Sequence, residues 1–230
     1  MQLPPRQYSR HLIRHWVKLA IAIFFISIFL YLSLSFEDNY LDKYVMEMVE
    51  DFRTPFLNGP AVDITALGSV TLLTLFTFFI LILFALKKRW MDFAQLFIAQ
   101  AGSGIISRTS KEFYMRPRPT MVEKLVEVSN YSYPSGHSLA TATFYVTIGL
   151  LLCEYYKSHR SRVVIFMLGF LMMGLVGLSR IYLGVHYPSD VIGGFALGSA
   201  WALLLPAIMS FGRRSDNGDF VDEHKLPARN

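Results

Sequence analysis

Three short polar segments stand out in this chain because their residue types and spacing could do chemistry. The first, residues 111–119, reads KEFYMRPRP and carries two cations, Lys111 and Arg118, seven positions apart. Pro117 and Pro119 force the chain out of a helix into an extended conformation, so Arg118 is held in place and does not sweep through solvent. Two fixed cations, one of them a planar guanidinium, suit the oxygens of a phosphate. The alternative is a basic flank of a membrane helix.

The second segment, residues 133–138, reads YPSGHS and precedes an apolar run. Proline, serine and glycine at a helix start leave backbone N–H groups unpaired, and the helix dipole adds positive potential there, so this end can bind an anion. Gly136 allows the backbone to approach closely, Ser135 can donate a hydroxyl proton, and His137 offers a proton. The alternative is a capped helix with a histidine at the membrane interface.

The third segment, residues 179–190, reads SRIYLGVHYPSD. Asp190 follows His186 by four positions, and Pro188 between them suits the first turn of a helix. A carboxylate there can accept a hydrogen bond from one imidazole nitrogen and leave the lone pair of the other free to attack. Arg180 supplies another fixed cation. A lone interfacial histidine is usually structural, but this histidine has a carboxylate partner and two anion-binding segments elsewhere in the chain.

The composition shows which kind of element must position these segments. Hydrophobic residues make up 53% of the 230 residues and charged residues 17%, and the mean hydropathy is +0.38. Ordinary soluble domains carry about 25% charged residues, so this chain has too little polar surface for a soluble globule, a disordered chain, collagen or a coiled coil. The single cysteine, Cys153, excludes an internal disulfide. The net charge of +5 would indicate nucleic acid in a soluble protein, but here we expect a lipid bilayer and no nucleic acid as the partner.

Six apolar stretches are predicted to cross the membrane as helices, at residues 17–36, 64–86, 92–111, 137–153, 163–182 and 190–212. A crossing helix needs about 18–20 apolar residues, and three runs reach this length without a charged residue: Leu19–Phe36, Ile64–Leu86 and Val191–Gly212. The other three include a polar residue at one end, and a buried helix of a soluble protein could be as short. The three clear spans argue against that alternative, because the intervening runs must return the chain across the membrane. The predicted fold class is therefore all-α, a polytopic bundle of six transmembrane helices.

Lysine and arginine set the predicted orientation, since cytoplasmic flanks carry an excess of them. Fourteen of the 22 basic residues fall on one side, which is therefore cytoplasmic: Arg6, Arg10, Arg14, Lys18, Lys87, Lys88, Arg89, Lys157, Arg160, Arg162, Arg213, Arg214, Lys225 and Arg229. Both termini then lie inside the cell, and the three polar segments lie outside. This divides the chain into a basic N-terminus (1–16), a transmembrane domain (17–212) and a polar cytoplasmic tail (213–230).

Two further segments have simpler interpretations. The basic N-terminus before an apolar run resembles a signal peptide, but the run is long and no small-x-small cleavage site follows it, so we expect an uncleaved first span. Residues 36–59 interleave aromatic and acidic residues and are predicted to form an amphipathic helix on the outer surface. The tyrosines near the polar segments are interpreted first as residues of the interfacial belt and only second as head-group contacts: Tyr131, Tyr133, Tyr182 and Tyr187.

Together, the three polar segments resemble the motifs of the type-2 phosphatidic acid phosphatase superfamily. Residues 111–119 match K-x6-RP, residues 134–137 match PSGH, and residues 179–190 match SR-x5-H-x3-D, in order and without a substitution. The resemblance implies an integral membrane lipid phosphatase of the cell (inner) membrane with its active site on the extracytoplasmic face. The substrates it implies are phosphatidate, phosphatidylglycerophosphate or undecaprenyl diphosphate.

The resemblance also implies a role for each motif residue. His186 attacks phosphorus and becomes a phosphohistidine, Asp190 holds its tautomer, and His137 protonates the leaving oxygen and then helps to activate water. The groups implied to bind the phosphate are Lys111, Arg118, Ser135, Gly136 and Arg180. We expect no metal and no other cofactor, because three cations and a helix N-terminus can stabilise the transferred group. Arg116 is predicted to make head-group contacts at most, and Arg108 to line the same cavity or to snorkel.

Three alternatives stay open at this point. The same site could serve a lipid A phosphatase, or a phosphotransferase that passes the phosphate to an acceptor other than water. The related vanadium haloperoxidases share this anion pocket, but those proteins are soluble. A transport or structural bundle could bind an anion without turnover. The physiological lipid and the oligomeric state are not determined by the sequence.

Overall fold

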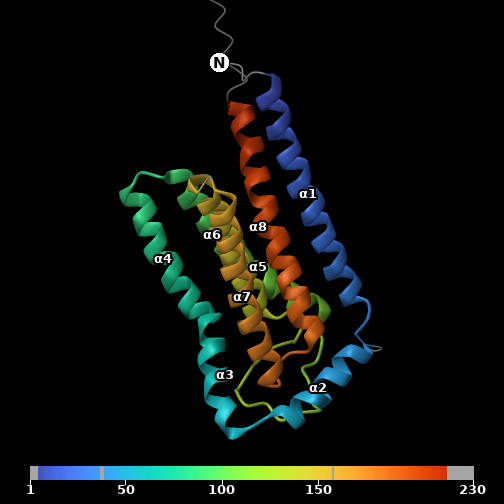
Figure 1. Ribbon diagram of the computed structural model, residues 1–230. Helices are drawn as coiled ribbons and strands as arrows, with labels where there is room; N and C mark the ends of the chain where they lie inside the picture. The colour runs from blue at the N-terminus through green and yellow to red at the C-terminus, as the bar shows by residue number, and fades with distance from the viewer. Residues whose placement is uncertain (1–4, 37–38, 157, 217–230) are drawn as a thin grey trace, which may run out of the picture.

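The computed structural model describes residues 5–36, 39–156 and 158–216, with side chains described from residue 16 to residue 209 apart from these gaps. This part of the chain contains eight α-helices and no strand, which confirms the all-α prediction (Figure 1). The helices are α1 (Pro5–Ser33), α2 (Tyr40–Phe52), α3 (Pro55–Leu67), α4 (Val70–Leu86), α5 (Trp90–Tyr114), α6 (Gly136–Tyr155), α7 (His159–Tyr182) and α8 (Pro188–Asp216). Residues 1–4 of the predicted basic N-terminus and 217–230 of the predicted tail lie outside the described residues.

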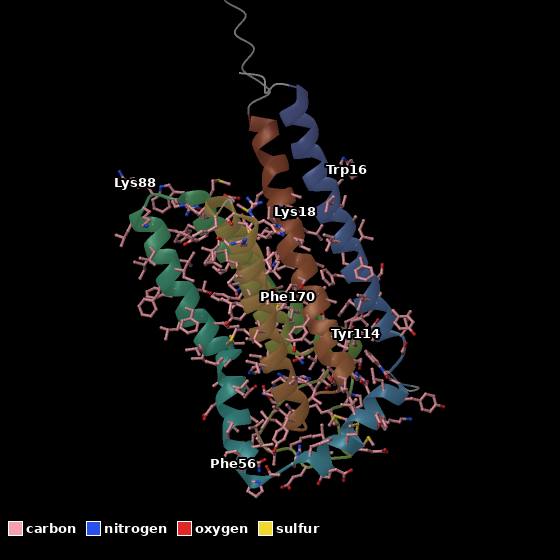
Figure 2. All side chains as sticks on the ribbon, in the orientation of Figure 1. Trp16, Lys18, Phe56, Lys88, Tyr114 and Phe170 are labelled. Atoms are coloured by element: carbon pink, nitrogen blue, oxygen red, sulfur yellow. The ribbon has the colours of Figure 1, made fainter. Side chains whose placement is uncertain are left out.

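Helices α6 and α8 form the centre of the bundle (Figure 1). Helix α1 packs along α8, and α5 and α7 pack on α6. Helix α4 contacts α5, and α3 contacts α7, while the short helix α2 lies across the end of the bundle where the α5–α6 and α7–α8 loops gather (Figure 1). Large apolar side chains such as Trp16, Phe56 and Phe170 are exposed on the outside, as expected for an integral membrane protein (Figure 2).

Among the residues that the structure describes, four helices are long and apolar enough to cross a membrane: Trp16–Ser33 in α1, Gly136–Tyr155, His159–Tyr182 and Pro188–Met209 in α8. Helices α3 and α4 together would make a fifth span, bent by 41°. Helix α5 does not qualify, since its middle carries Gln95, Gln100, Ser103 and Ser107. The six predicted spans and the position of the termini relative to the membrane therefore remain predictions.

The predicted span at 64–86 is not one continuous helix. Helix α3 ends at Leu67, and α4 starts afresh at Val70. Ser69 caps α4, because its Oγ accepts a hydrogen bond from the Leu72 N–H at 3.2 Å. A Cβ at Gly68 would lie 2.3 Å from Val176, so this residue lets the bend approach α7 closely. The bend follows from a local cap and a close contact. Neither lowers the hydropathy of the run, so the hydropathy of the sequence predicted one continuous span.

The predicted amphipathic helix at 36–59 is two helices. Helix α2 is capped by Asn39 and ends at Phe52, and α3 begins with Thr54 as N-cap and Pro55 in its first turn. Helix α2 is amphipathic, with Tyr40 and Tyr44 exposed and Met46 fully buried. The prediction of helix was therefore correct, but the N-cap Thr54 and Pro55 start a second helix and divide the predicted one in two.

Glycines on α8 bring the second and third polar segments together. A Cβ at Gly194 would lie 2.6 Å from the carbonyl oxygen of Ser135, and one at Gly198 would lie 2.4 Å from that of Leu139. The carbonyl of Gly198 also accepts a hydrogen bond from Thr143 Oγ1 at 3.3 Å. Close backbone approach through small residues is how membrane helices pack tightly. The contact places the start of α6 beside the start of α8.

We expect Gly198→Ala to destabilise the protein by about 1–3 kcal/mol, because the added methyl forces α6 and α8 apart. Gly174→Ala on α7 is the matched control, since a Cβ there meets nothing within 4 Å. Thermal unfolding of both variants in detergent measures the effect. Equal melting temperatures for the two variants would contradict this account of the α6–α8 contact.

Candidate active site

The three polar segments converge at one end of the bundle, where α5, α6, α7 and α8 meet. Arg180, His186, Lys111 and Arg118 all lie close enough to His137 to interact with it electrostatically. His137 stands in the first turn of α6, and Asp190 stands in the first turn of α8. Residues from three separate parts of the sequence therefore share one site, as their types indicated.

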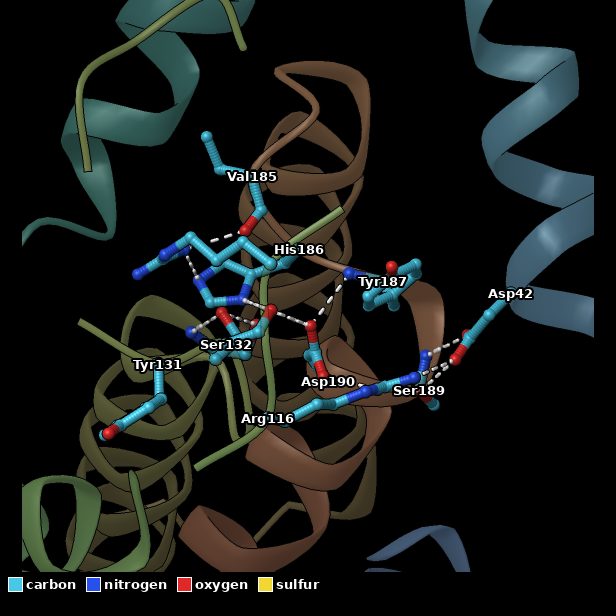
Figure 3. Close-up of polar contacts among 12 residues, drawn as sticks. Asp42, Arg116, Tyr131, Ser132, Val185, His186, Tyr187, Ser189 and Asp190 are labelled. Carbon is cyan, nitrogen blue, oxygen red and sulfur yellow. Dashed lines mark hydrogen bonds and ion pairs between the residues drawn. The ribbon is translucent and has the colours of Figure 1, made fainter. Parts of the chain in front are cut away.

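His186 is backed by a carboxylate and a hydroxyl (Figure 3). Its Nδ1 lies 3.4 Å from Asp190 Oδ2 and 3.3 Å from Ser132 Oγ. The Ser132 hydroxyl donates a short hydrogen bond to the same Oδ2, which also accepts the Tyr187 N–H at 2.8 Å. Pro188 starts α8, and this start places Asp190 one helical turn from His186. The Nδ1 side of the imidazole is therefore occupied.

The other imidazole nitrogen faces a cation. His186 Nε2 lies 3.3 Å from Arg118 Nη1, and a guanidinium can only donate, so this contact fits an imidazole with its proton on Nδ1 and a lone pair on Nε2. Burial lowers the pKa of His186 to about 4, despite the opposing effect of its hydrogen bond with Asp190. The imidazole is therefore neutral near pH 7, and the Nε2 lone pair is available for attack.

Backbone carbonyls hold two of the cations in place. Arg118 donates to the carbonyl oxygens of Val185 at 2.7 Å, Ser129 at 3.0 Å and Asn130 at 3.0 Å. Lys111 Nζ donates to the carbonyl oxygens of Tyr131 at 2.6 Å and Ser132 at 3.2 Å. These acceptors are neutral, so they fix both cations and leave their charge available to an anion.

Arg180 lies buried beside them. Its Nη1 donates to Thr65 Oγ1 at 3.0 Å, while its Nε is buried without a hydrogen-bond partner among the described residues. An unpaired buried donor on a guanidinium is costly unless an acceptor arrives. The site thus combines three cations with an unsatisfied N–H, which suits a phosphate.

Ser135 and Gly136 form the start of α6. Ser135 is fully buried, and its Oγ accepts hydrogen bonds from the Ser138 N–H at 3.4 Å and the Ser138 hydroxyl at 3.0 Å. This is the capping alternative, but it uses Ser135 only as an acceptor and leaves its own proton for another partner. Gly136 lies against Lys111 and Ser107, because a Cβ there would lie 3.2 Å from Ser107 Oγ.

The prediction for Arg116 was wrong. Its side chain is 5% exposed and does not reach out toward a head group. Its Nη1 donates to Asp190 Oδ1 at 2.6 Å, and its Nη2 donates to Asp42 Oδ2 at 2.8 Å (Figure 3). Sequence reasoning missed Asp42 because it lies 74 residues from Arg116, and it missed Ser132, which carried no signal beyond its place two residues before Pro134.

The belt interpretation was also wrong for Tyr133. This side chain is fully buried, its hydroxyl donates to the Phe29 carbonyl at 2.6 Å, and its ring stacks on Phe29 at 5.2 Å. Tyr182 is half-buried and donates to Asn58 at 2.9 Å, while Tyr131 is exposed and Tyr187 is half-buried. Only Tyr131 has the exposure expected of a belt residue.

A groove of about 920 Å³ opens beside Lys111 and Gly136. It runs between α4 and α5, and apolar side chains of α4, including Leu73 and Phe78, line it. Arg108 also lines this groove, as one of the predicted alternatives required, although it is exposed and pairs with Glu112 at 3.0 Å. The groove therefore connects an apolar helix surface to the cationic site.

Comparison with known sequences finds several similar proteins of named activity, among them a phosphatidylglycerophosphatase and an undecaprenyl-diphosphatase. Phosphatidylglycerophosphatase B of Bacillus subtilis is 34% identical over 160 residues, which cover 68% of this chain and 77% of that protein. An undecaprenyl-diphosphatase of Sulfolobus acidocaldarius is 37% identical over 100 residues, which cover 44% of this chain and 40% of that protein. The second similarity thus spans less than half the length of either chain.

Comparison with solved structures and family models agrees with these similarities. The crystal structure of a transmembrane PAP2-type phosphatidylglycerolphosphate phosphatase from Bacillus subtilis superimposes with a TM-score of 0.75 at 28% identity, and covers 83% of this chain and 96% of that chain. The model of the PAP2 superfamily matches residues 92–214, more than half of the chain and all three polar segments. The resemblance carried by the motifs is confirmed: this chain belongs to the PAP2 superfamily and is a membrane lipid phosphatase, a hydrolase of lipid phosphate esters.

Proposed function

We propose that this protein hydrolyses a phosphomonoester or a diphosphate of a membrane lipid, removing its terminal phosphate through a phosphohistidine on His186. The observation that carries the proposal is the orientation of His186, with Nδ1 against Asp190 and Nε2 toward Arg118. A nucleophile whose free nitrogen faces a phosphate-binding cation is arranged for in-line attack on phosphorus.

In the first step, the Nε2 lone pair of His186 attacks the terminal phosphorus, and the bond from phosphorus to the leaving oxygen breaks, which is the ester oxygen of a phosphomonoester or the bridging oxygen of a diphosphate. His137 gives its proton to that leaving oxygen. Asp190 stabilises the positive charge that develops on the imidazole, while Lys111, Arg118 and Arg180 neutralise the phosphoryl oxygens. The products are the dephosphorylated lipid and the phosphoenzyme.

In the second step, water attacks the phosphohistidine. His137, now neutral, takes a proton from the water, and the bond from phosphorus to Nε2 breaks to release inorganic phosphate. The lone pair returns to Nε2, and His137 is protonated again for the next cycle. Positioning and charge stabilisation by the protein's own side chains supply the catalysis in both steps.

The groove between α4 and α5 supports entry of the substrate from the membrane. Its apolar wall suits an acyl or prenyl chain, and its open end at Lys111 and Gly136 would place the attached phosphate at the cations. The similar proteins make phosphatidylglycerophosphate and undecaprenyl diphosphate the first substrates to test. The distribution of basic residues supports a location in the cell (inner) membrane, with this site on the extracytoplasmic face.

We expect His186→Ala to lower phosphate release by roughly a thousandfold or more, because the attacking group is lost. His159→Ala is the matched control, since His159 is exposed at the start of α7, away from the site. Release of inorganic phosphate is measured in detergent from phosphatidate, phosphatidylglycerophosphate, undecaprenyl diphosphate and lipid A. Comparable loss in both variants would argue against a special role for His186.

With p-nitrophenyl phosphate as the substrate, we expect His137→Asn to accumulate phosphoenzyme. The p-nitrophenolate leaving group needs no acid, so the first step proceeds without His137, whereas hydrolysis of the phosphohistidine needs a base. The assay follows radioactive phosphate on the protein after mixing with labelled substrate. The label should be stable to base and labile to acid, and absent from His186→Ala. An acid-stable label would identify another nucleophile.

We expect excess EDTA to leave the rate within about twofold of its untreated value, since three cations do the work of metal ions. The expectation rests on Lys111, Arg118 and Arg180, which lie together near His137. Phosphate release with EDTA, and with EDTA followed by excess magnesium, is the measurement. Loss of activity that magnesium restores would overturn the expectation.

A further inference from the structure

We propose that Asp42 and Arg116 form a clamp that positions Asp190 for its contact with His186, so that helix α2 is a working part of the site. The clamp is defined as the ion pairs of Arg116 with Asp42 and with Asp190. The proposal rests on the proposed function, because it assigns positioning residues to the same reaction.

Arg116 is held in one orientation. Its guanidinium lies 4.3 Å from the ring of Phe36 and 4.3 Å from that of Tyr187. Its Nη1 reaches both Asp190 Oδ1 at 2.6 Å and Ser189 Oγ at 2.7 Å, and its Nη2 reaches Asp42. Two aromatic rings and a fork of directed hydrogen bonds leave the guanidinium no other rotamer that keeps its partners.

Asp190 divides its two oxygens between Arg116 and His186. Oδ1 pairs with Arg116, and Oδ2 faces His186, Ser132 and the Tyr187 N–H (Figure 3). The terminal torsion of a carboxylate is broad, so its direction must come from its partners. By fixing Oδ1, Arg116 sets where Oδ2 points and therefore how the imidazole is held.

Asp42 anchors the clamp to α8 from another part of the chain. Its Oδ1 accepts a hydrogen bond from the Ser189 N–H at 2.9 Å. Its Oδ2 accepts a short hydrogen bond from the Ser189 hydroxyl and another from Arg116. A carboxylate at a helix start satisfies unpaired N–H groups and suits the helix dipole. Asp42 thus does for α8 what a local N-cap residue would do, and fixes the turn that carries Asp190.

Helix α2 is docked firmly enough to carry this anchor. Met46 on the same face is fully buried. At the other end of the helix, Arg53 donates to the Tyr182 carbonyl from both Nε at 3.1 Å and Nη2 at 2.8 Å. Contacts near both ends tie this surface helix to the two elements, α7 and α8, that flank His186.

The competing role for Arg116 is direct binding of a phosphate or head group. The geometry argues against direct binding, because Asp190 lies between Arg116 and His186 and the guanidinium already donates hydrogen bonds to two carboxylates (Figure 3). The two roles predict different kinetics. A positioning residue lowers kcat and leaves KM unchanged, whereas a ligand-binding residue raises KM and weakens inhibition by inorganic phosphate.

The test compares Arg116→Gln and Asp42→Asn with Arg160→Gln and Asp51→Asn, two matched changes at exposed residues. We expect kcat to fall roughly 10–100-fold in the first pair, as for a small misplacement of a catalytic group. KM and the inhibition constant of inorganic phosphate should stay within about threefold of wild type. Arg116→Lys should recover part of the lost kcat, because it keeps the charge but not the fork.

The double variant Asp42→Asn/Arg116→Gln tests whether the two residues act as a unit. We expect it to lose no more kcat than the worse single variant, whereas independent losses would multiply. Should Arg116→Gln fail to elute as a folded protein, Asp42→Asn alone decides, since it keeps the pair of Arg116 with Asp190. Unchanged kcat in Asp42→Asn, or a rise in KM without loss of kcat, would overturn the clamp.

A second readout separates the clamp from the proposed function. Carbethoxylation of His186 by diethylpyrocarbonate, located by mass spectrometry, needs no lipid substrate. We expect it to be at least about threefold faster in Arg116→Gln and Asp42→Asn than in the two control variants, because the imidazole is held less tightly. Equal labelling rates would reject the clamp, whereas failure of wild type to release phosphate from any lipid would reject the proposed function alone.

Discussion

Three cations must be held within reach of one another in an apolar bundle, and the rest of the site depends on how this repulsion is managed. Neutral acceptors fix all three: backbone carbonyls hold Lys111 and Arg118, and a threonine hydroxyl holds Arg180. If carboxylates held these cations, ion pairs within the protein would neutralise their positive charge. The site therefore keeps a net positive field for an anionic substrate, and one nearby carboxylate, Asp190, serves the imidazole.

The carboxylate of Asp190 makes no ion pair with Lys111, Arg118 or Arg180 among the described residues. Asp190 is fully buried behind His186, where Arg116, Ser132 and a backbone N–H satisfy its oxygens. The imidazole stands between this carboxylate and Arg118, so its two nitrogens face surroundings of opposite charge. This arrangement favours the tautomer with its proton on Nδ1 and directs the Nε2 lone pair toward Arg118.

Helix packing provides the precision that this arrangement needs. The α6–α8 contact is close because glycines on α8 face backbone atoms of α6, which leaves little freedom for the two helix starts to move apart. The buried Tyr133 adds to this, since a Cβ at Gly193 of α8 would lie 2.6 Å from its ring. Its hydroxyl also ties the loop before α6 to α1 through Phe29. The site is thus supported from α1, α6 and α8 together.

The sequence by itself determined the all-helical class, the family and the motif residues that gather at the site, but not Asp42, Ser132 or the role of Arg116. These features are encoded locally: apolar runs of a given length, proline and glycine at helix starts, and a histidine four positions before an aspartate. The tertiary structure decided the rest. The bend at Gly68, the burial of Tyr133 and the pairing of Asp42 with Arg116 each depend on contacts between distant parts of the chain. Arg116 has the same local sequence whether it meets lipid or a carboxylate, and only the packing of α2 against α8 supplies that carboxylate.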